Sequence, residues 1–202
     1  MIDLAAVRYI GPPVDDLSLL GALPSELRAF YGGVNGCVLF GGGLHLRGVC
    51  RTPTWHSLAY VWRGAHALHT RYPHVTADDV PFGQDAVGDQ FLLRDGIVWR
   101  LAAETGDVDS TELSFTAFME AARADPVEFL SLWPLLQLDQ EGKALQPGQL
   151  LSVYPPYCTT EAAKGVSLRA IPALERLEWL ADFAAQIRAV PDGRSVNIRI
   201  AE

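Results

Sequence analysis

Cysteine is scarce in this sequence and shows no pairing pattern. Only three cysteines occur among 202 residues, at positions 37, 50 and 158, and none belongs to a C-x-x-C pair. An odd number cannot be fully paired within one chain. We therefore expect reduced, mostly buried thiols in a reducing compartment rather than a disulfide framework.

Long apolar runs are missing too. The longest extend over only a few residues, well short of the length that crosses a bilayer. The sequence has no basic and then apolar opening segment, no repeat of fixed period and no low-complexity tract. About half of the residues are apolar, which suffices for a core without cross-links. We expect a cytoplasmic protein that does not bind membranes.

Negative charge is concentrated in the middle of the chain. The net charge is −8, and residues 78–128 carry twelve acidic and three basic side chains, whereas the stretches on either side are close to neutral. A field of this sign repels nucleic acid and anionic membranes, and it steers a basic partner toward the protein. A merely well-solvated acidic face gives the same pattern, so charge alone leaves both interpretations open.

Apolar periodicity and turn residues indicate a mixture of helices and strands. The strongest local signal is a pair of apolar runs around Asp95-Gly96, which is typical of a hairpin with a type I′ turn. Ser114 is the expected N-cap of a later helix. We expect helices at 23–31, 55–71, 114–122, 125–133 and 172–189, and strands at 37–40, 44–46, 90–94, 97–101, 150–154, 166–171 and 196–200.

The order of these elements is mixed and does not alternate regularly between strand and helix. It predicts an α+β fold with a central, mostly antiparallel sheet flanked by helices and a C-terminal α/β extension. Residues 137–149 are polar, contain glycine and proline, and form the best linker candidate. We expect one domain over residues 1–135 and an extension over residues 136–202 that packs on it.

Motifs for phosphate binding and nucleophilic catalysis are missing. Gly41-Gly42-Gly43 lacks the later glycine of a dinucleotide fingerprint, and Gly142-Lys143 lacks the upstream glycine of a phosphate loop. There is no G-x-S-x-G elbow, and no local signature marks a cysteine for pairing with histidine. Sequence does not show the carboxylate separation that glycoside hydrolysis needs. We expect neither enzymatic activity nor a cofactor.

Histidines offer one alternative to this expectation. His66 and His69 lie three residues apart in the expected second helix, and two imidazoles one turn apart can bind one metal ion. A zinc protease needs a spacing of four with an intervening glutamate, and this stretch has neither. A metal-dependent enzyme using the region of His56, His66 and His69 is therefore the least favoured alternative, and we predict no metal site.

Four short motifs occur in a distinctive order: LPSELRAFY (23–31) ahead of Asn35-Gly36, FGQDAVGDQF (82–91), DGIV (95–98) and SFTAF (114–118). The ordered set resembles the SUKH superfamily, which includes the fungal Smi/Knr-type cell-wall regulators and many bacterial immunity proteins. The resemblance covers roughly residues 20–125 and does not extend to the tail from about residue 135. It implies an α+β fold, no catalytic residues, and a function in protein binding.

The resemblance and the acidic segment together predict an immunity protein. Such a protein binds a cognate bacterial toxin, here one with a basic surface, and neutralises it by occlusion. A regulatory or scaffold module of the same family remains an alternative, and the sequence predicts no particular oligomeric state. The partner-binding residues that we expect within the segment are Asp85, Asp89, Glu104, Asp107 and Asp109.

Overall fold

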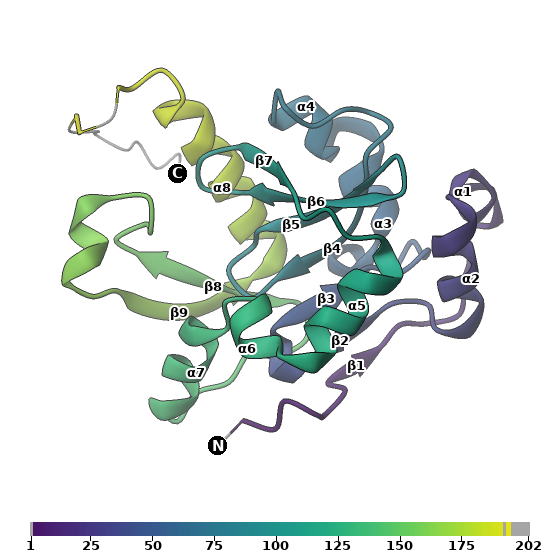
Figure 1. The fold of residues 1–202 in the computed structure, drawn as a ribbon, viewed down its shortest axis with the longest axis horizontal. Helices are drawn as coiled ribbons and strands as arrows, with labels where there is room; N and C mark the ends of the chain where they lie inside the picture. The colour runs from purple at the N-terminus through teal and green to yellow at the C-terminus, as the bar shows by residue number, and fades with distance from the viewer. Residues whose placement is uncertain (1, 192, 195–202) are drawn as a thin grey trace.

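Seven antiparallel strands form the main sheet of the protein (Figure 1). The computed structural model describes residues 2–191 and 193–194. Each strand pairs with the next one along the chain, so the sheet is a meander with β1 and β7 at its edges. The strands are β1 (Tyr9–Ile10), β2 (Cys37–Leu39), β3 (Leu44–Leu46), β4 (Val80–Asp85), β5 (Gln90–Arg94), β6 (Ile97–Ala102) and β7 (Asp107–Ser110).

Helices accompany this sheet, and a separate two-stranded sheet follows it, which confirms the expected α+β fold class. None of the described helices is long and apolar enough to cross a membrane. The later strands are β8 (Gln149–Tyr154) and β9 (Ser167–Pro172). The α-helices are α1 (Leu17–Ala22), α2 (Ser25–Gly33), α3 (Leu58–Trp62), α4 (Leu68–Arg71), α5 (Phe115–Ala124), α6 (Pro126–Phe129), α7 (Trp133–Gln140) and α8 (Ala173–Ile187). Short 3₁₀ turns are η1 (Phe40–Gly42), η2 (Thr54–His56), η3 (Gly64–His66) and η4 (Thr160–Lys164).

The central hairpin forms as its sequence predicts. β5 and β6 pair in register from Arg94 opposite Ile97 to Gln90 opposite Leu101. Asp95 and Gly96 connect them with φ values of 50° and 79°, and positive φ at both central residues defines a type I′ turn. Local chain chemistry is therefore sufficient to set this register.

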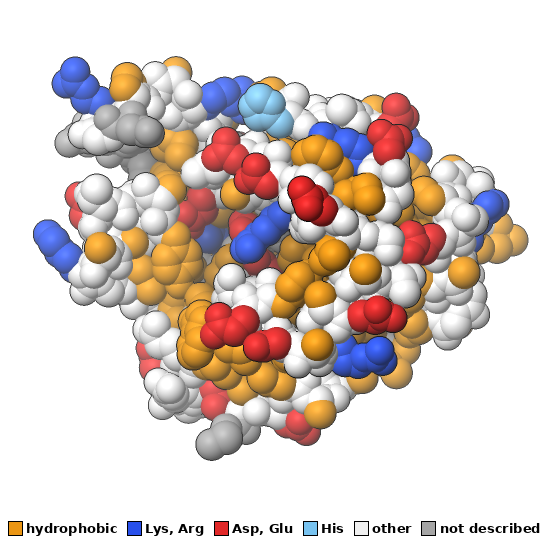
Figure 2. Space-filling view, in the orientation of Figure 1, with side chains coloured by type: hydrophobic (Ala, Val, Ile, Leu, Met, Phe, Trp, Pro, Cys, Tyr) orange, Lys and Arg blue, Asp and Glu red, His pale blue; other side chains and the backbone are white. Residues whose placement is uncertain are grey.

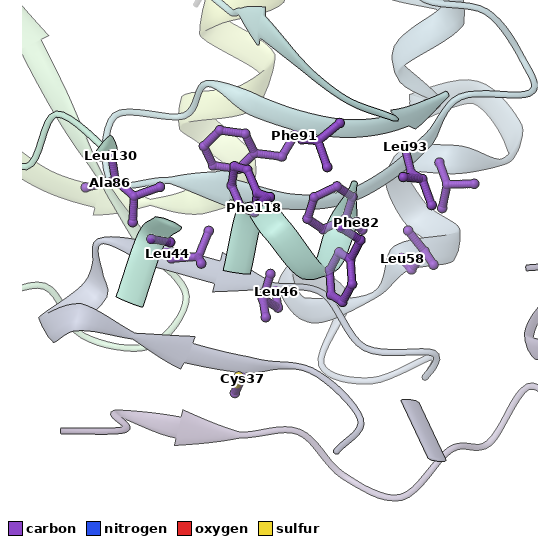
Figure 3. Close-up of a cluster of buried hydrophobic side chains, with 14 of the residues drawn as sticks. Cys37, Leu44, Leu46, Leu58, Phe82, Ala86, Phe91, Leu93, Phe118 and Leu130 are labelled. Carbon is purple, nitrogen blue, oxygen red and sulfur yellow. The ribbon is translucent and has the colours of Figure 1, made fainter. Parts of the chain in front are cut away.

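Aromatic side chains from β4, β5 and α5 fill the centre of the core (Figure 3). The Phe118 ring lies 4.7 Å from that of Phe91 and 5.8 Å from that of Phe82, measured between centroids. Ser114 begins α5 as expected, because its side chain accepts a hydrogen bond from the Ala117 N–H. The cap and the apolar face of α5 together fix this helix against the sheet.

The prediction of one long helix over 55–71 is wrong. The chain instead forms η2, α3, η3 and α4 in succession. Arg63 is extended, Gly64 has φ 74°, and Ala67 is extended again, so each short helix ends within a turn or two. Glycine adopts positive φ at little cost, which permits the break. The apolar spacing in the sequence reflects several short segments that face the same core, not one continuous helix.

The C-terminal segment packs on the same core as the main sheet. Leu151 and Val153 of β8 and Leu168 of β9 belong to the buried cluster that contains the phenylalanines. The Leu151 N–H also donates to the Ala86 carbonyl oxygen at 2.8 Å, which joins β8 to the turn after β4. These contacts position α8 beside the β4–β5 turn (Figure 1).

The stretch from 137 to 149 is not the linker that its composition suggests. Its first residues belong to α7, which also crosses the domain boundary expected after residue 135. Leu138 and Leu145 are buried, so this stretch is anchored in the core. The strand expected at 196–200 lies outside the described residues. The sequence also gave no indication of α1, which has only six residues.

Candidate binding pocket and acidic face

A cavity of about 510 Å³ opens between the main sheet and the C-terminal segment. Its floor comes from the β4–β5 turn, β6 and α8, and its walls come from α7 and the loop after β8. Acidic and basic side chains line the floor, whereas Trp133 and Tyr157 stand at the wall, 59% and 45% exposed. We refer to this cavity as the pocket.

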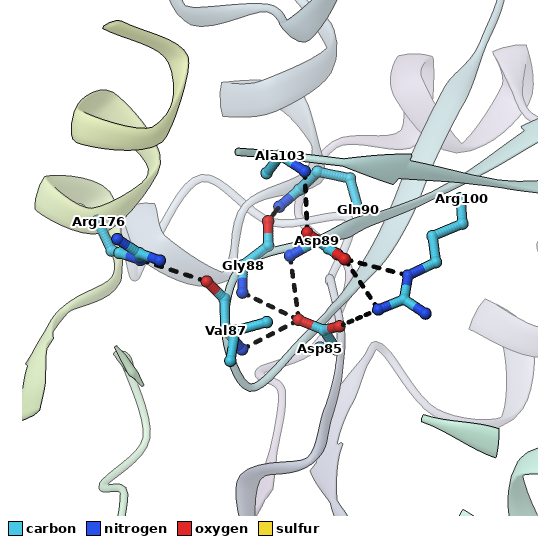
Figure 4. A network of polar contacts seen from close by, with 8 residues as sticks. All are labelled: Asp85, Val87, Gly88, Asp89, Gln90, Arg100, Ala103 and Arg176. Carbon is cyan, nitrogen blue, oxygen red and sulfur yellow. Dashed lines mark hydrogen bonds and ion pairs between the residues drawn. The ribbon is translucent and has the colours of Figure 1, made fainter. Parts of the chain in front are cut away.

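Asp85 occupies the floor because it organises the β4–β5 turn (Figure 4). Its Oδ1 accepts hydrogen bonds from the N–H groups of Val87, Gly88 and Asp89 at 2.9–3.0 Å. Gly88 has φ 106°, and a Cβ there would lie 2.6 Å from Leu180 of α8. Glycine is therefore required where the turn meets this helix.

Arg100 of β6 joins the two aspartates of the turn. Its Nε and Nη2 donate to Asp89 Oδ2 at 3.1 and 2.8 Å, and its Nη2 also reaches Asp85 Oδ2 at 3.3 Å. Asp89 Oδ1 in turn accepts from the Ala103 N–H at 2.9 Å. Burial and the neighbouring Asp89 raise the pKa of Asp85 to about 7, despite Arg100. The floor thus contains a carboxyl group that titrates near neutrality.

Arg176 of α8 forms the opposite side of the floor. Its Nε donates to the Val87 carbonyl oxygen at 3.3 Å, and its side chain is only 1% exposed. Its Nη2 has no hydrogen-bond partner among the described residues and lies 3.6 Å from Glu104 Oε1. Glu104 Oε2 accepts from the Cys158 N–H at 3.0 Å, and burial raises the pKa of Glu104. The contact between Arg176 and Glu104 is an ion pair without a hydrogen bond.

The five expected partner-binding residues divide into two groups. Asp85, Asp89 and Glu104 line the pocket, with side chains 2%, 16% and 12% exposed, and each pairs with an arginine. They are therefore not part of an open acidic surface. Asp107 and Asp109 are exposed on the edge strand β7, as a partner-binding surface requires.

Further exposed carboxylates surround β7. Figure 2 shows acidic side chains distributed over the face that carries β6, β7, α5 and α6 in Figure 1. Within the part of the chain that the structure describes, none of those on β7, α5, α6 and the adjoining turns forms an ion pair. We call this set the acidic face: Asp107, Asp109, Glu112, Glu120, Asp125 and Glu128.

Sequence reasoning missed Arg176, Trp133 and Tyr157 as pocket residues. Arg176 lies 89 positions after Val87 and reaches its carbonyl oxygen only because α8 packs beside the β4–β5 turn. Trp133 begins α7 and stands among apolar residues in the sequence, which suggests a core position. Its side chain is nevertheless 59% exposed. Neither residue type nor spacing in the sequence signals this arrangement.

The cysteines agree with the expectation of free, mostly buried thiols. All three are free, but only Cys37 and Cys50 are buried, whereas Cys158 is exposed at the pocket. Partial desolvation of the sulfur, together with the adjacent Glu104, raises the pKa of the Cys158 thiol to about 11. The thiol is therefore protonated at neutral pH and is not an activated nucleophile.

The structure separates the histidines of the metal hypothesis. His66 ends η3 and His69 lies in α4, so the two do not share a helix face. His56 is fully buried, where its ring nitrogens bond to His45 at 2.9 Å and to the Asn35 carbonyl oxygen at 3.0 Å. Among the described residues, no three or more His, Cys, Asp or Glu side chains are placed so that they could hold a metal ion.

Replacing Asp85 by asparagine should change how stability depends on pH. In the wild type, the folded pKa lies above the ordinary value of 3.8, so the folded state binds this proton more tightly than the unfolded state. The contribution of Asp85 to stability therefore falls as pH rises through this interval. The free energy of unfolding of Asp85→Asn, relative to that of wild type, should therefore rise by about 2–3 kcal/mol between pH 5 and pH 8.

Urea unfolding at several pH values measures this gain. Asp78→Asn is the matched control, since Asp78 is exposed and forms no ion pair with a described residue. If the free energies of unfolding of wild type and Asp85→Asn change with pH in parallel, Asp85 is ionised in the folded protein throughout this range.

No family model matches the chain, and no curated protein matches its sequence. A function for this protein must therefore be argued from its own geometry and from the motif resemblance.

Proposed function

We propose that this protein binds a partner protein with a basic surface through the acidic face. The observation that carries the proposal is the division of carboxylates in residues 78–128. Those inside the molecule pair with Arg94, Arg100 or Arg176, whereas those of the acidic face have no cation partner among the described residues. The exposed charge is thus available to another molecule.

The negative charge of the acidic face favours association with a basic partner. Unpaired carboxylates on one face repel each other in the free protein, and a basic partner relieves that repulsion. The same field accelerates encounter with such a partner and disfavours nucleic acid and anionic membranes. The acidic face therefore favours fast and selective association with a basic protein.

The edge strand β7 supports recognition through side-chain charge. Asp107 and Asp109 lie on this strand, and charged residues on a sheet edge disfavour pairing with a further strand. A partner that docks here therefore contacts side-chain carboxylates and does not extend the sheet by backbone hydrogen bonds.

The specific form that we propose is immunity. The resemblance to the SUKH superfamily favours a cytoplasmic protein that occludes a cognate toxin in the producing cell. Toxins that cleave nucleic acid have basic clefts, which an acidic face complements. A regulatory or scaffold module with a basic cellular partner would use the same surface.

Coexpression with the toxin encoded beside the gene tests the proposal. We expect wild-type protein to restore growth and to copurify with the toxin. Absence of both rescue and complex would overturn the immunity proposal. Capture of one basic housekeeping protein in a strain without the toxin would favour the regulatory alternative.

A further inference from the structure

The polar side chains of the pocket do not use their full hydrogen-bonding capacity among themselves. Glu104 Oε1 and Arg176 Nη2 are 3.6 Å apart, so they form an ion pair but no hydrogen bond. Asp85 Oδ2 has only a long contact of 3.3 Å with Arg100. Two carboxylate oxygens therefore retain capacity for a donor. Acceptors with spare capacity at the floor of a cavity suggest that a ligand donates to them.

The charges that line the pocket indicate whether the ligand is a cation or an anion. Three carboxylates line it, those of Asp85, Asp89 and Glu104, against the two guanidinium groups of Arg100 and Arg176. The unpaired nitrogen of Arg176 alone would suit an anion. An anion would, however, have to approach three carboxyl groups against two guanidinium groups. The balance favours a cation.

The walls of the pocket suit a planar cation. Trp133 and Tyr157 line it with side chains that are about half exposed, and Tyr154, 72% exposed, ends β8 three residues before Tyr157. Aromatic rings attract guanidinium groups through cation–π contact and stacking. Exposed Trp and Tyr beside a pocket are also typical anchors of protein interfaces.

The pocket is continuous with the acidic face. Thr105 lines the pocket, and its hydroxyl donates to the Asp107 carboxylate at 2.7 Å, where β7 begins. A partner seated on the acidic face is therefore within reach of the pocket.

We infer that the pocket receives an arginine side chain of the partner protein. The inference rests on the proposed function and adds the residue that anchors the complex. The guanidinium donates to the Glu104 and Asp85 oxygens that lack short contacts and lies against the rings of Trp133 and Tyr157. The acidic face accelerates the encounter, and the pocket slows dissociation.

Alkylation of Cys158 tests the pocket without the partner. Cys158 is the exposed thiol at the pocket, whereas Cys37 and Cys50 are buried and serve as internal controls. We expect the peptide acetyl-Gly-Arg-Gly-amide to slow alkylation of Cys158 to about one fifth at roughly four times its Kd, because only the free protein reacts. The same peptide with citrulline, which is uncharged and of similar shape, should bind at least about tenfold more weakly.

Variants assign the effect to the pocket. Glu104→Gln should abolish protection by the arginine peptide, and Glu161→Gln, the same change on exposed η4, should leave it intact. Equal protection by citrulline, stronger protection by a glutamate peptide, or no protection by the arginine peptide would overturn the inference.

The toxin complex separates failure of this inference from failure of the proposed function. If Glu104→Gln and Trp133→Ala leave the dissociation rate of the complex unchanged, the partner does not use the pocket, although the proposed function stands. If the arginine peptide protects Cys158 but no basic partner binds the protein, the pocket stands and the proposed function fails.

Discussion

Replacing Arg47 by methionine should lower the free energy of unfolding by about 3 kcal/mol or more. Arg47 is 1% exposed and has no carboxylate partner among the described residues. Instead it donates to the carbonyl oxygens of Pro81 and Gly83 at 2.8 and 3.2 Å, and to the side-chain oxygens of Gln84 and Gln90 at 2.6 and 2.5 Å. Methionine fills similar space but leaves each of these buried acceptors without that donor.

The charge state of Arg47 supports this expectation. Burial lowers its pKa to about 9, which still leaves it protonated at neutral pH. The network therefore contains a buried cation that is hydrogen-bonded by neutral oxygens, and it connects the residue after β3 with β4 and β5.

Urea unfolding followed by circular dichroism measures the loss. Arg51→Met is the matched control, because Arg51 is exposed and its side chain forms no hydrogen bond with the described residues, whereas its backbone N–H donates to Asp15. That change should cost less than about 0.5 kcal/mol. Similar losses for the two variants would show that the Arg47 network contributes little to stability.

Reversing charge on the acidic face should slow association with the toxin. Asp107→Lys combined with Asp109→Lys should reduce the association rate constant by about tenfold or more at low salt, because the long-range attraction weakens. The reduction should shrink as salt rises, since the Debye length falls from about 10 Å at 0.1 M to about 3 Å at 1 M. Surface plasmon resonance at several salt concentrations measures both effects.

A matched variant separates local charge from net charge. Glu161→Lys combined with Glu175→Lys changes the net charge equally at exposed positions outside the acidic face. It should slow association only slightly. If the two double variants behave alike, or if the slowing is the same at every salt concentration, the acidic face is not the recognition surface.

Local sequence predicted those parts of the fold that local chemistry determines. The Asp95-Gly96 turn fixed the central hairpin, and Ser114 fixed the start of α5. The break at Gly64 interrupts an apolar pattern that continues beyond it, and the burial of Leu145 depends on contacts with distant segments. Periodicity misled at residues 55–71 and composition at residues 137–149, because neither reports whether the backbone is continuous or which side chains distant segments cover.

The site followed the same pattern. Its acidic segment was evident from charge counts, but Arg100 and Arg176 neutralise part of that segment through contacts that sequence spacing does not show. The exposed pair Asp107 and Asp109 was included in the prediction, yet nothing distinguished it from the buried Asp85. The exposure of each carboxylate decides whether it pairs with an arginine of the same chain or is accessible to a partner. That exposure is a property of the fold.

Amide hydrogen exchange on the complex with the neighbouring toxin tests the central claim most directly. We expect slower exchange in residues 107–112, and in the loop at 155–158 that borders the pocket, with β1 at the opposite sheet edge unchanged. Protection confined to β1 and β2, with residues 107–112 exchanging as in the free protein, would contradict binding through the acidic face.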